Sequence, residues 1–271
     1  MYRLVENYVD LPKFVRKPLW RLWHNLIITW EKENVVMRFM NYGYAPIEDD
    51  AQQLELLPAD ESERYSIQLY DHGARQTEIE GKEVLEVGCG RGGGASYITR
   101  YMHPKSYTGV DLSTSGINFC NSFYRIPQLN FIRGDAEDLP IEDDSMDVVV
   151  NVESSRCYGN IMQFFSEVKR VLRSDGTFVL VDMRWAEDVP ELKRQVQEAG
   201  FVIDSEENIS PNVVRALELD ADRRDRLIRQ KVPKFLNKAF GEFAGVRGSE
   251  RYESFASGRM QYWCFTLKPS V

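Results

Sequence analysis

The residues best suited to chemistry begin with a glycine-rich segment, EVGCGRGGG at positions 86–94. It follows a short apolar run and opens a stretch with helical character. Glycines let backbone amides approach a ligand closely, and the N-terminus of a helix adds partial positive charge. Asp111 ends the next apolar run, 21 residues after Gly90, where a carboxylate can hydrogen-bond ribose hydroxyls. These features predict a site for a nucleoside-containing cofactor.

The glycines have two alternative roles that stay open. Gly88, Gly90 and Gly93 also satisfy the GxGxxG pattern of dinucleotide-binding proteins, so an NAD-dependent oxidoreductase is one alternative. A purely structural turn is the second, because tight turns use glycine as well. Asp111 and Asp135 both follow strand-like runs, so each has the alternative role of a helix N-cap.

The elements that must position these residues alternate between strand and helix. Near-continuous apolar runs are typical of parallel strands buried on both faces. Five such runs occur, at 84–87, 106–111, 129–133, 146–151 and 177–182. We expect one helix from Ile161 to Leu172, stopped by Ser174-Asp175-Gly176, and another from Val189 to Ala199 before a strand at 201–203. This alternation predicts an α/β fold with a doubly wound, mostly parallel sheet, and ligands at the carboxyl ends of its strands.

Further segments extend the pattern. GDAEDLP follows the third run, and Asn151 ends the fourth. Residues 65–208 as a whole resemble the class I S-adenosylmethionine-dependent methyltransferases. The resemblance depends on four segments and their order: VLEVGCGRGGG, TGVDLS, FIRGDAEDLPIEDDSMDVVV and EVKRVLRSDGTFVLVD. The resemblance implies S-adenosyl-L-methionine as cofactor and a seven-stranded Rossmann-like sheet. The GDAEDLP segment argues against the oxidoreductase.

The same resemblance assigns cofactor contacts by position. It implies that Glu86, Gly88, Gly90 and Gly92 form the loop against the methionine and ribose parts of the cofactor. It also implies that Asp111 binds the ribose diol and that Leu112 makes an apolar contact with the adenine. Asp135 and the backbone of Ala136 would make polar contacts with the adenine, and Asn151 would lie beneath the methionyl group. We expect Tyr70 to close over the cofactor, with a plain core aromatic as the alternative.

A closer resemblance concerns the acceptor. The segments VVMRFMNYGY, IQLY, GGGASY, FGEFAGV and YWCFT resemble small-molecule O-methyltransferases of lipid or polyketide hydroxyls, such as the methyltransferases of phthiotriolone and phenolphthiotriolone dimycocerosates. The resemblance implies methyl transfer to a hydroxyl of a small, fairly apolar metabolite. C- or N-methylation and a non-catalytic cofactor-binding module stay open as alternatives.

The general base is not settled by the sequence. Related small-molecule enzymes often carry a histidine after the fourth strand, but Arg156 stands there and arginine stays protonated. Asp182, after the fifth strand, is the first candidate for a base, and its alternative role is a helix cap. Glu153 is the second candidate. His72, in the helix that leads to the first strand, is the third, with ordinary helix surface as its alternative.

Composition limits the partners. The formal net charge is −8 and the pI is near 5.1, which disfavours nucleic acid. No run of about 18 apolar residues occurs, and the N-terminal residues carry charges early, so we expect a cytoplasmic protein with no stable membrane anchor. No Cys/His spacing suggests a metal site. A homo-oligomer is compatible with the sequence.

The sequence suggests four regions. We expect an N-terminal helical cap or lid at 1–80, the cofactor-binding core at 81–208, a helical cap insertion at 209–250 and a C-terminal strand region at 251–271. The aromatic stretch 18–30 is predicted as a helix, either packed on the core or on another subunit, or lining an apolar substrate pocket.

Overall fold

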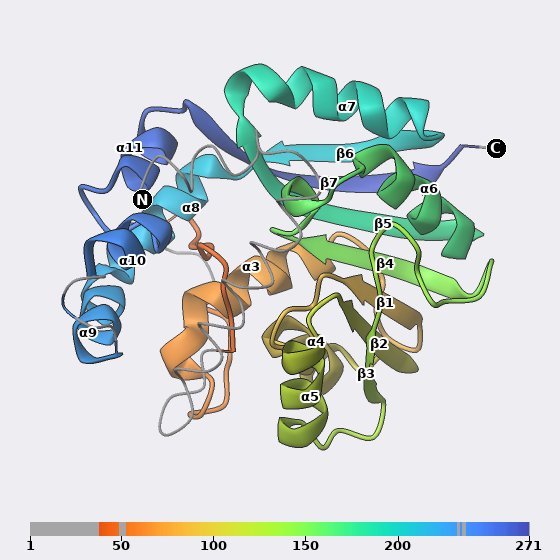
Figure 1. Cartoon of the computed structure of the whole chain (residues 1–271), viewed down its shortest axis with the longest axis horizontal. Helices are drawn as coiled ribbons and strands as arrows, with labels where there is room; N and C mark the ends of the chain where they lie inside the picture. Colours follow the sequence, from red (N-terminus) through yellow and green to blue (C-terminus); the bar gives the residue numbers. More distant parts are fainter. Residues whose placement is uncertain (1–37, 49–52, 232–233, 235–236, 271) are drawn as a thin grey trace.

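A computed structural model describes residues 38–48, 53–231, 234 and 237–270. These residues form a seven-stranded sheet in the order β3-β2-β1-β4-β5-β7-β6 (Figure 1). The strands are β1 (Glu83–Val87), β2 (Ser106–Asp111), β3 (Leu129–Arg133), β4 (Met146–Val152), β5 (Leu172–Trp185), β6 (Phe201–Asn208) and β7 (Met260–Pro269). The first five strands pair in parallel, whereas β7 runs antiparallel between β5 and β6. The predicted doubly wound, mostly parallel sheet is confirmed.

Helices cover both faces of the sheet. One face carries α3 (Arg64–Ala74), α4 (Gly93–Met102), α5 (Thr114–Phe123), α8 (Ser210–Leu219) and α11 (Glu250–Ala256). The other carries α6 (Ile161–Val171) and α7 (Val189–Glu198). The remaining described helices are α9 (Ala221–Lys231), α10 (Asn237–Phe243) and the short 3-10 turns η1 (Glu61–Glu63), η2 (Ser155–Cys157) and η3 (Ala186–Asp188). Helices α8 to α11 gather on the left in Figure 1.

The two faces have separate apolar cores because successive strand residues point to opposite sides. Val179 and Val181 of β5 belong to the core under α3, whereas Phe178 and Leu180 belong to the core under α6 and α7. All four side chains are fully buried. This burial on both faces explains why the strand sequences are continuous apolar runs.

The secondary structure differs from the expectations at three places. Ser174-Asp175-Gly176 does not end a helix: α6 ends when Leu172 turns extended, and 174–176 lie inside β5, where its register with β4 shifts. Residues 250–256 form α11, so the C-terminal strand begins at Met260 and not near 251. Residues 38–48, expected within a helical cap, have no regular secondary structure. The aromatic stretch 18–30 lies outside the described residues.

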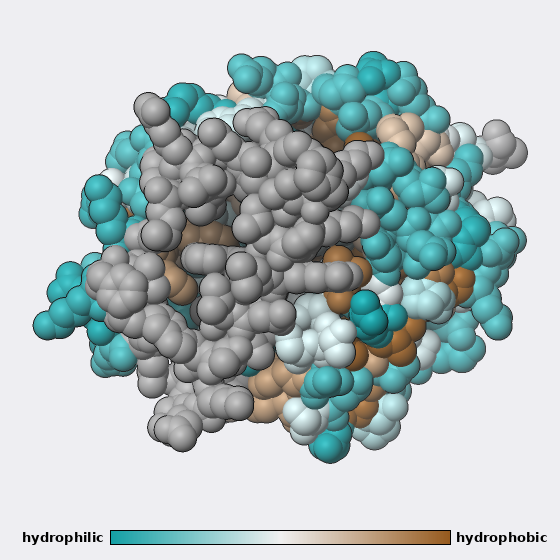
Figure 2. Space-filling model, in the orientation of Figure 1, coloured by the Kyte–Doolittle hydropathy of each residue, from teal (hydrophilic) through white to brown (hydrophobic). Residues whose placement is uncertain are grey.

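The surface is largely polar where it can be seen. Figure 2 shows mainly hydrophilic residues over the region of α6 and α7. None of the helices in the described part of the chain is long and apolar enough to cross a membrane.

Candidate active site

The glycine-rich segment forms the turn between β1 and α4. Gly88, Gly90 and Gly92 have φ values of 78°, 55° and 71°, which side chains rarely tolerate. The N–H of Gly88 donates to Val110 O at 2.8 Å, and the N–H of Gly90 donates to Asp111 Oδ2 at 2.9 Å. The turn is therefore fixed to the end of β2, as the sequence spacing required.

The turns after β2 and β3 lie beside it. Asp111 Oδ1 accepts from Ser113 N at 2.8 Å, and Asp111 O accepts from Gly134 N at 3.1 Å. Asp135 Oδ1 accepts from Glu137 N at 3.1 Å. Leu112 next to Asp111 is half-buried and Ala136 next to Asp135 is buried. The carboxyl ends of three neighbouring strands thus bring together the residues predicted to hold a nucleoside.

Glu86 is a buried carboxyl beneath the glycine turn. Its Oε1 accepts from the hydroxyl of Tyr70 at 2.8 Å and its Oε2 from the hydroxyl of Tyr107 at 3.1 Å. Burial raises the pKa of Glu86 to about 7, although both hydroxyls oppose the rise. The ring of Tyr70 lies so close to Gly94 that a Cβ there would come within 1.9 Å of it. Tyr70 therefore joins α3 to the start of α4 and to Glu86.

Asn151 ends β4 inside a small polar cluster. Its Nδ2 lies 2.8 Å from Val87 O, 2.7 Å from Ser154 Oγ and 3.0 Å from the hydroxyl of Tyr158. Its Oδ1 is buried and has no hydrogen-bond partner among the described residues. Ser154 and Tyr158 were not singled out from the sequence. They explain why position 88 is a glycine, because a Cβ there would lie 2.4 Å from Ser154 Oγ and 2.8 Å from the Tyr158 hydroxyl.

An irregular segment at 38–48, which we call the strap, packs against the glycine turn. A Cβ on Gly93 would lie 2.5 Å from Arg38 O, and a Cβ on Gly90 would lie 3.2 Å from Met40 Cε. Arg224 of α9 donates to the carbonyl of Tyr42 at 3.0 Å. The strap thus joins the helical group α8–α11 to the sheet. The sequence pointed to this segment only through the likeness of VVMRFMNYGY.

Glu153 follows β4 directly and faces the strap. Its Oε1 accepts from Tyr42 N at 2.7 Å and from the hydroxyl of Tyr262 on β7, while its Oε2 has no partner among the described residues. Its φ of 52° is in the left-handed region, which costs energy for a non-glycine residue. Burial raises the pKa of Glu153 to about 7, against the lowering effect of the Tyr262 hydroxyl and the Tyr42 N–H. A carboxyl with this pKa takes up and releases a proton near neutral pH.

Asp182 is buried and its two oxygens are occupied. Oδ2 accepts from Ser155 Oγ at 2.5 Å and lies 3.2 Å from the Arg184 guanidinium, and Oδ1 accepts from Met183 N at 2.8 Å. Oδ2 also accepts from Arg156 N at 3.2 Å. Asp182 therefore fixes the 3-10 turn η2 to β5.

Comparisons with known proteins identify the family. A family model described as a methyltransferase domain matches residues 85–180. A phthiotriol/phenolphthiotriol dimycocerosates methyltransferase of Mycobacterium tuberculosis is 40% identical over 252 residues, which are 92% of each chain. A fatty-acid O-methyltransferase of Mycolicibacterium smegmatis is 39% identical over 265 residues, covering 93% of this chain and 94% of its own. The chain belongs to the S-adenosylmethionine-dependent methyltransferases.

Solved structures share the fold of this methyltransferase at low identity. The [4+2]-cyclase SpnF superposes with a TM-score of 0.66 at 19% identity, with 94% of each chain covered. Geranyl diphosphate C-methyltransferase of Streptomyces coelicolor, solved with S-adenosyl-L-homocysteine, gives a TM-score of 0.63 at 19% identity, covering 91% of this chain and 98% of its own. Because one fold supports both a cyclase and a C-methyltransferase, the reaction must be argued from the site.

The methyltransferase uses S-adenosylmethionine, and its residues fit this cofactor. The glycine turn offers backbone without side chains, and the Asp111 carboxylate at the end of β2 suits the two donors of a ribose diol. The buried Asn151 Oδ1 lacks a partner among the described residues, and an ammonium donor would supply one. The contacts of each predicted residue with the cofactor, from Tyr70 and the glycine turn to Asn151, stay predictions.

His72 lies at a different place from Glu153. Its Nε2 is 3.0 Å from Glu207 Oε2 on the edge strand β6, and its ring stacks on Tyr44 at 4.3 Å between centroids. The structure therefore ties His72 to an exposed glutamate. Among the described residues, no group of three or more His, Cys, Asp or Glu side chains could hold a metal ion.

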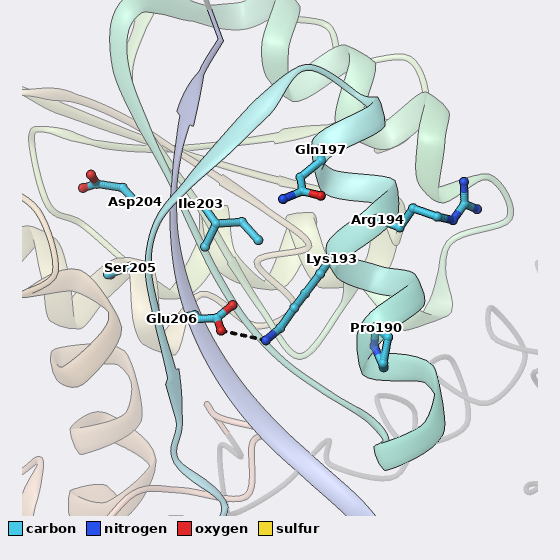
Figure 3. A pocket seen from close by; sticks show the side chains of 8 residues that line it. All are labelled: Pro190, Lys193, Arg194, Gln197, Ile203, Asp204, Ser205 and Glu206. Carbon is cyan, nitrogen blue, oxygen red and sulfur yellow. Dashed lines mark hydrogen bonds and ion pairs between the residues drawn. The ribbon is translucent and has the colours of Figure 1, made fainter.

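A surface groove lies between α7 and β6, away from the strand ends that carry the site (Figure 3). Lys193 reaches across it and forms an ion pair with Glu206 at 2.7 Å, whereas Arg194 points away. The groove is open and contains none of the predicted site residues. It therefore contributes nothing to the cofactor site of the methyltransferase.

Proposed function

We propose that this methyltransferase methylates an oxygen atom of a small, largely apolar, lipid-like acceptor, and that Glu153 is the general base for a hydroxyl. The geometry of Glu153 carries the proposal. Two donors hold one carboxylate oxygen and leave Oε2 without a partner among the described residues. The pKa of about 7 suits proton uptake near neutral pH.

The relatives support the acceptor class. One acts on phthiotriol/phenolphthiotriol dimycocerosates and another is a fatty-acid O-methyltransferase, and each matches more than nine-tenths of this chain. Apolar residues also surround the strap: Phe39 packs edge-on against Tyr70, and Tyr42 against Phe255. An acceptor with an apolar body and a reactive oxygen suits such surroundings.

The chemistry needs positioning and the removal of one proton. When bound, S-adenosylmethionine would supply an electrophilic methyl group to the acceptor oxygen and would leave as S-adenosylhomocysteine. As the new O–C bond forms, Glu153 Oε2 would accept the proton of the acceptor hydroxyl. Tyr42 N and Tyr262 hold the carboxylate in place during this transfer. Positioning of this kind is a large part of the rate gain in such displacements.

Asp182 has a different role in this proposal. Its oxygens are held by Ser155, Arg184 and two backbone N–H groups, so it is poorly placed to take a substrate proton. We assign it to positioning, because it fixes the turn that follows Glu153. His72 has its own partner at the sheet edge and takes no part.

The test compares Glu153→Gln with wild type. Both proteins receive labelled S-adenosylmethionine and alkyl alcohols, alkylphenols, fatty acids and alkylamines of matched chain length. We expect O-methylated products from wild type, and a loss of about 100-fold or more in hydroxyl methylation by Glu153→Gln. Binding of S-adenosylhomocysteine should be unchanged, and the exposed Glu78→Gln is the matched control. Methylation at carbon or nitrogen only, or full activity of Glu153→Gln on alcohols, would refute the proposal.

A further inference from the structure

Arg156 lies beside the proposed base and has no acidic partner among the described residues. It belongs to η2, just after β4, and its backbone N–H donates to Asp182 Oδ2 at 3.2 Å. Its side chain is half-buried, and it forms no ion pair within 4.0 Å with any residue that the structure describes. The guanidinium instead contacts the thiol of Cys157, the next residue along the chain.

Three other arginines are paired with carboxylates. Arg184 lies 3.2 Å from Asp182, Arg224 lies 2.9 Å from Asp220, and Arg100 lies 2.7 Å from Asp60. Each of those carboxylates is almost completely buried and offsets a cation. Taking a guanidinium partly out of water without such compensation is unfavourable. Arg156 differs from these three arginines, because no described carboxylate lies within ion-pair distance of its guanidinium.

The neighbouring carboxyls stabilise this charge only from beyond ion-pair distance. Asp182 is already paired with Arg184. Glu153 interacts with Arg156 only at longer range, and burial raises the pKa of Glu153 to about 7, so it is partly protonated at neutral pH. Tyr42 of the strap also lies near the guanidinium. Within the described part of the chain, Arg156 therefore adds a positive charge that has no direct ion pair, close to the carboxyl group of the proposed base.

We propose that Arg156 binds a carboxylate of the acceptor, so that the enzyme selects apolar acids over apolar alcohols. This inference rests on the proposed function, since it concerns the same acceptor. A guanidinium presents two parallel N–H donors that match the two oxygens of a carboxylate. If that carboxylate is itself methylated, its oxygen would form a bond to the methyl carbon as the S–CH3 bond of S-adenosylmethionine breaks. A methyl ester and S-adenosylhomocysteine would result, and no proton would have to be removed. If it only orients a hydroxy acid, the hydroxyl proton goes to Glu153.

The experiment measures binding and needs no turnover. Decanoic acid and 1-decanol, matched in chain length, are titrated into enzyme saturated with S-adenosylhomocysteine. We expect wild type to bind the acid about 10-fold more tightly or better, and Arg156→Gln to lose this preference with its affinity for decanol unchanged. Arg156→Lys keeps the positive charge but not the two parallel N–H donors, so it should keep part of the preference for the acid. Arg229→Gln, at an exposed position on α9, is the control.

Several outcomes would overturn the inference. Equal binding of acid and alcohol by wild type, no measurable binding of decanoic acid, or an acid preference retained by Arg156→Gln would each do so. Thermal unfolding and S-adenosylhomocysteine affinity show whether Arg156→Gln is folded, and Arg156→Lys provides the second variant if it is not.

Activity assays separate this inference from the proposed function. Methylation of alcohols without any acid preference would contradict only the role of Arg156. An acid preference in binding without any O-methylated product would contradict only the function. The Glu153→Gln variant separates the two roles of the bound carboxylate. If the variant still forms the ester of decanoic acid, the carboxylate is the methyl acceptor. If the variant still binds 10-hydroxydecanoic acid but no longer methylates its hydroxyl, the carboxylate only orients the acceptor. Both results support a carboxylate at Arg156.

Discussion

The hydroxyl of Tyr262 donates to Oε1 of Glu153, although the two residues are 109 positions apart in the sequence. The same oxygen accepts from Tyr42 N at 2.7 Å. The bond thus joins the end of β4, the strap and β7 at one carboxyl group. Both donors favour the charged form of Glu153, whereas burial favours the neutral form and prevails.

Removing the Tyr262 hydroxyl should move the pH dependence of catalysis. In Tyr262→Phe, the charged form of Glu153 loses one donor, so its pKa rises above the present value of about 7. Hydroxyl methylation at pH 7 should fall about 10-fold and recover at higher pH. The measurement is kcat/KM between pH 5.5 and 9.5. Tyr252→Phe, which breaks a tyrosine–glutamate bond with Glu218, is the control. A profile with an unchanged midpoint would contradict the role of Glu153.

Glu86 should make stability depend on pH. Its pKa of about 7 in the folded chain exceeds its ordinary value of 4.5, so between these values the folded state holds a proton that the unfolded state has lost. Stability from this group is therefore complete below about pH 4.5 and declines as pH rises through about 7. The full effect is up to about 3 kcal/mol.

Glu86→Gln should flatten this decline. Urea unfolding at pH 5 and pH 8 measures the free energy of unfolding of both proteins. Wild type should lose more stability between the two pH values than the variant does, because glutamine does not titrate. Identical losses in the two proteins would mean that Glu86 does not hold a proton in the fold.

Gly88 should resist substitution much more than Gly81. Both have positive φ, of 78° and 71°. A Cβ on Gly88 would meet Ser154 and Tyr158, whereas one on Gly81 would meet nothing within 4 Å. Gly81→Ala should therefore cost only the backbone strain, about 1 kcal/mol. Gly88→Ala should cost at least about 1 kcal/mol more from overpacking, and should weaken binding of S-adenosylhomocysteine. Equal unfolding midpoints for the two variants would contradict the packing of the Asn151 cluster against the turn.

Asp111→Asn should weaken cofactor binding. The carboxylate accepts from Gly90 N and Ser113 N, and we expect it to accept from the ribose hydroxyls. An amide has one acceptor oxygen and cannot replace all of these bonds, so affinity for S-adenosylhomocysteine should fall about 10-fold or more. Calorimetric titration measures this, with the exposed Asp138→Asn in the next turn as the control. Wild-type affinity of Asp111→Asn would remove Asp111 from the cofactor site.

The sequence by itself determined the sheet and the cofactor. Strands buried on both faces must be apolar runs, and a turn that meets both a ligand and a neighbouring strand must be glycine-rich, so β1 to β5 and the turn at 86–94 could be read from local pattern. Their likeness to class I methyltransferases then gave S-adenosylmethionine. The bulge at 174–176 and the helix α11 were not predicted, because Gly at 176 resembles a helix stop and the helix Glu250–Ala256 is only 7 residues long.

Only the tertiary structure revealed the different surroundings of the three candidate bases. Asp182 and Glu153 are both acids just after a strand, and the sequence ranked Asp182 first. The fold gives Asp182 the Arg184 and Ser155 partners, ties His72 to Glu207 from 135 residues away, and leaves an oxygen of Glu153 available. Which partner a charged side chain meets depends on contacts between distant segments, and local sequence pattern does not encode those contacts.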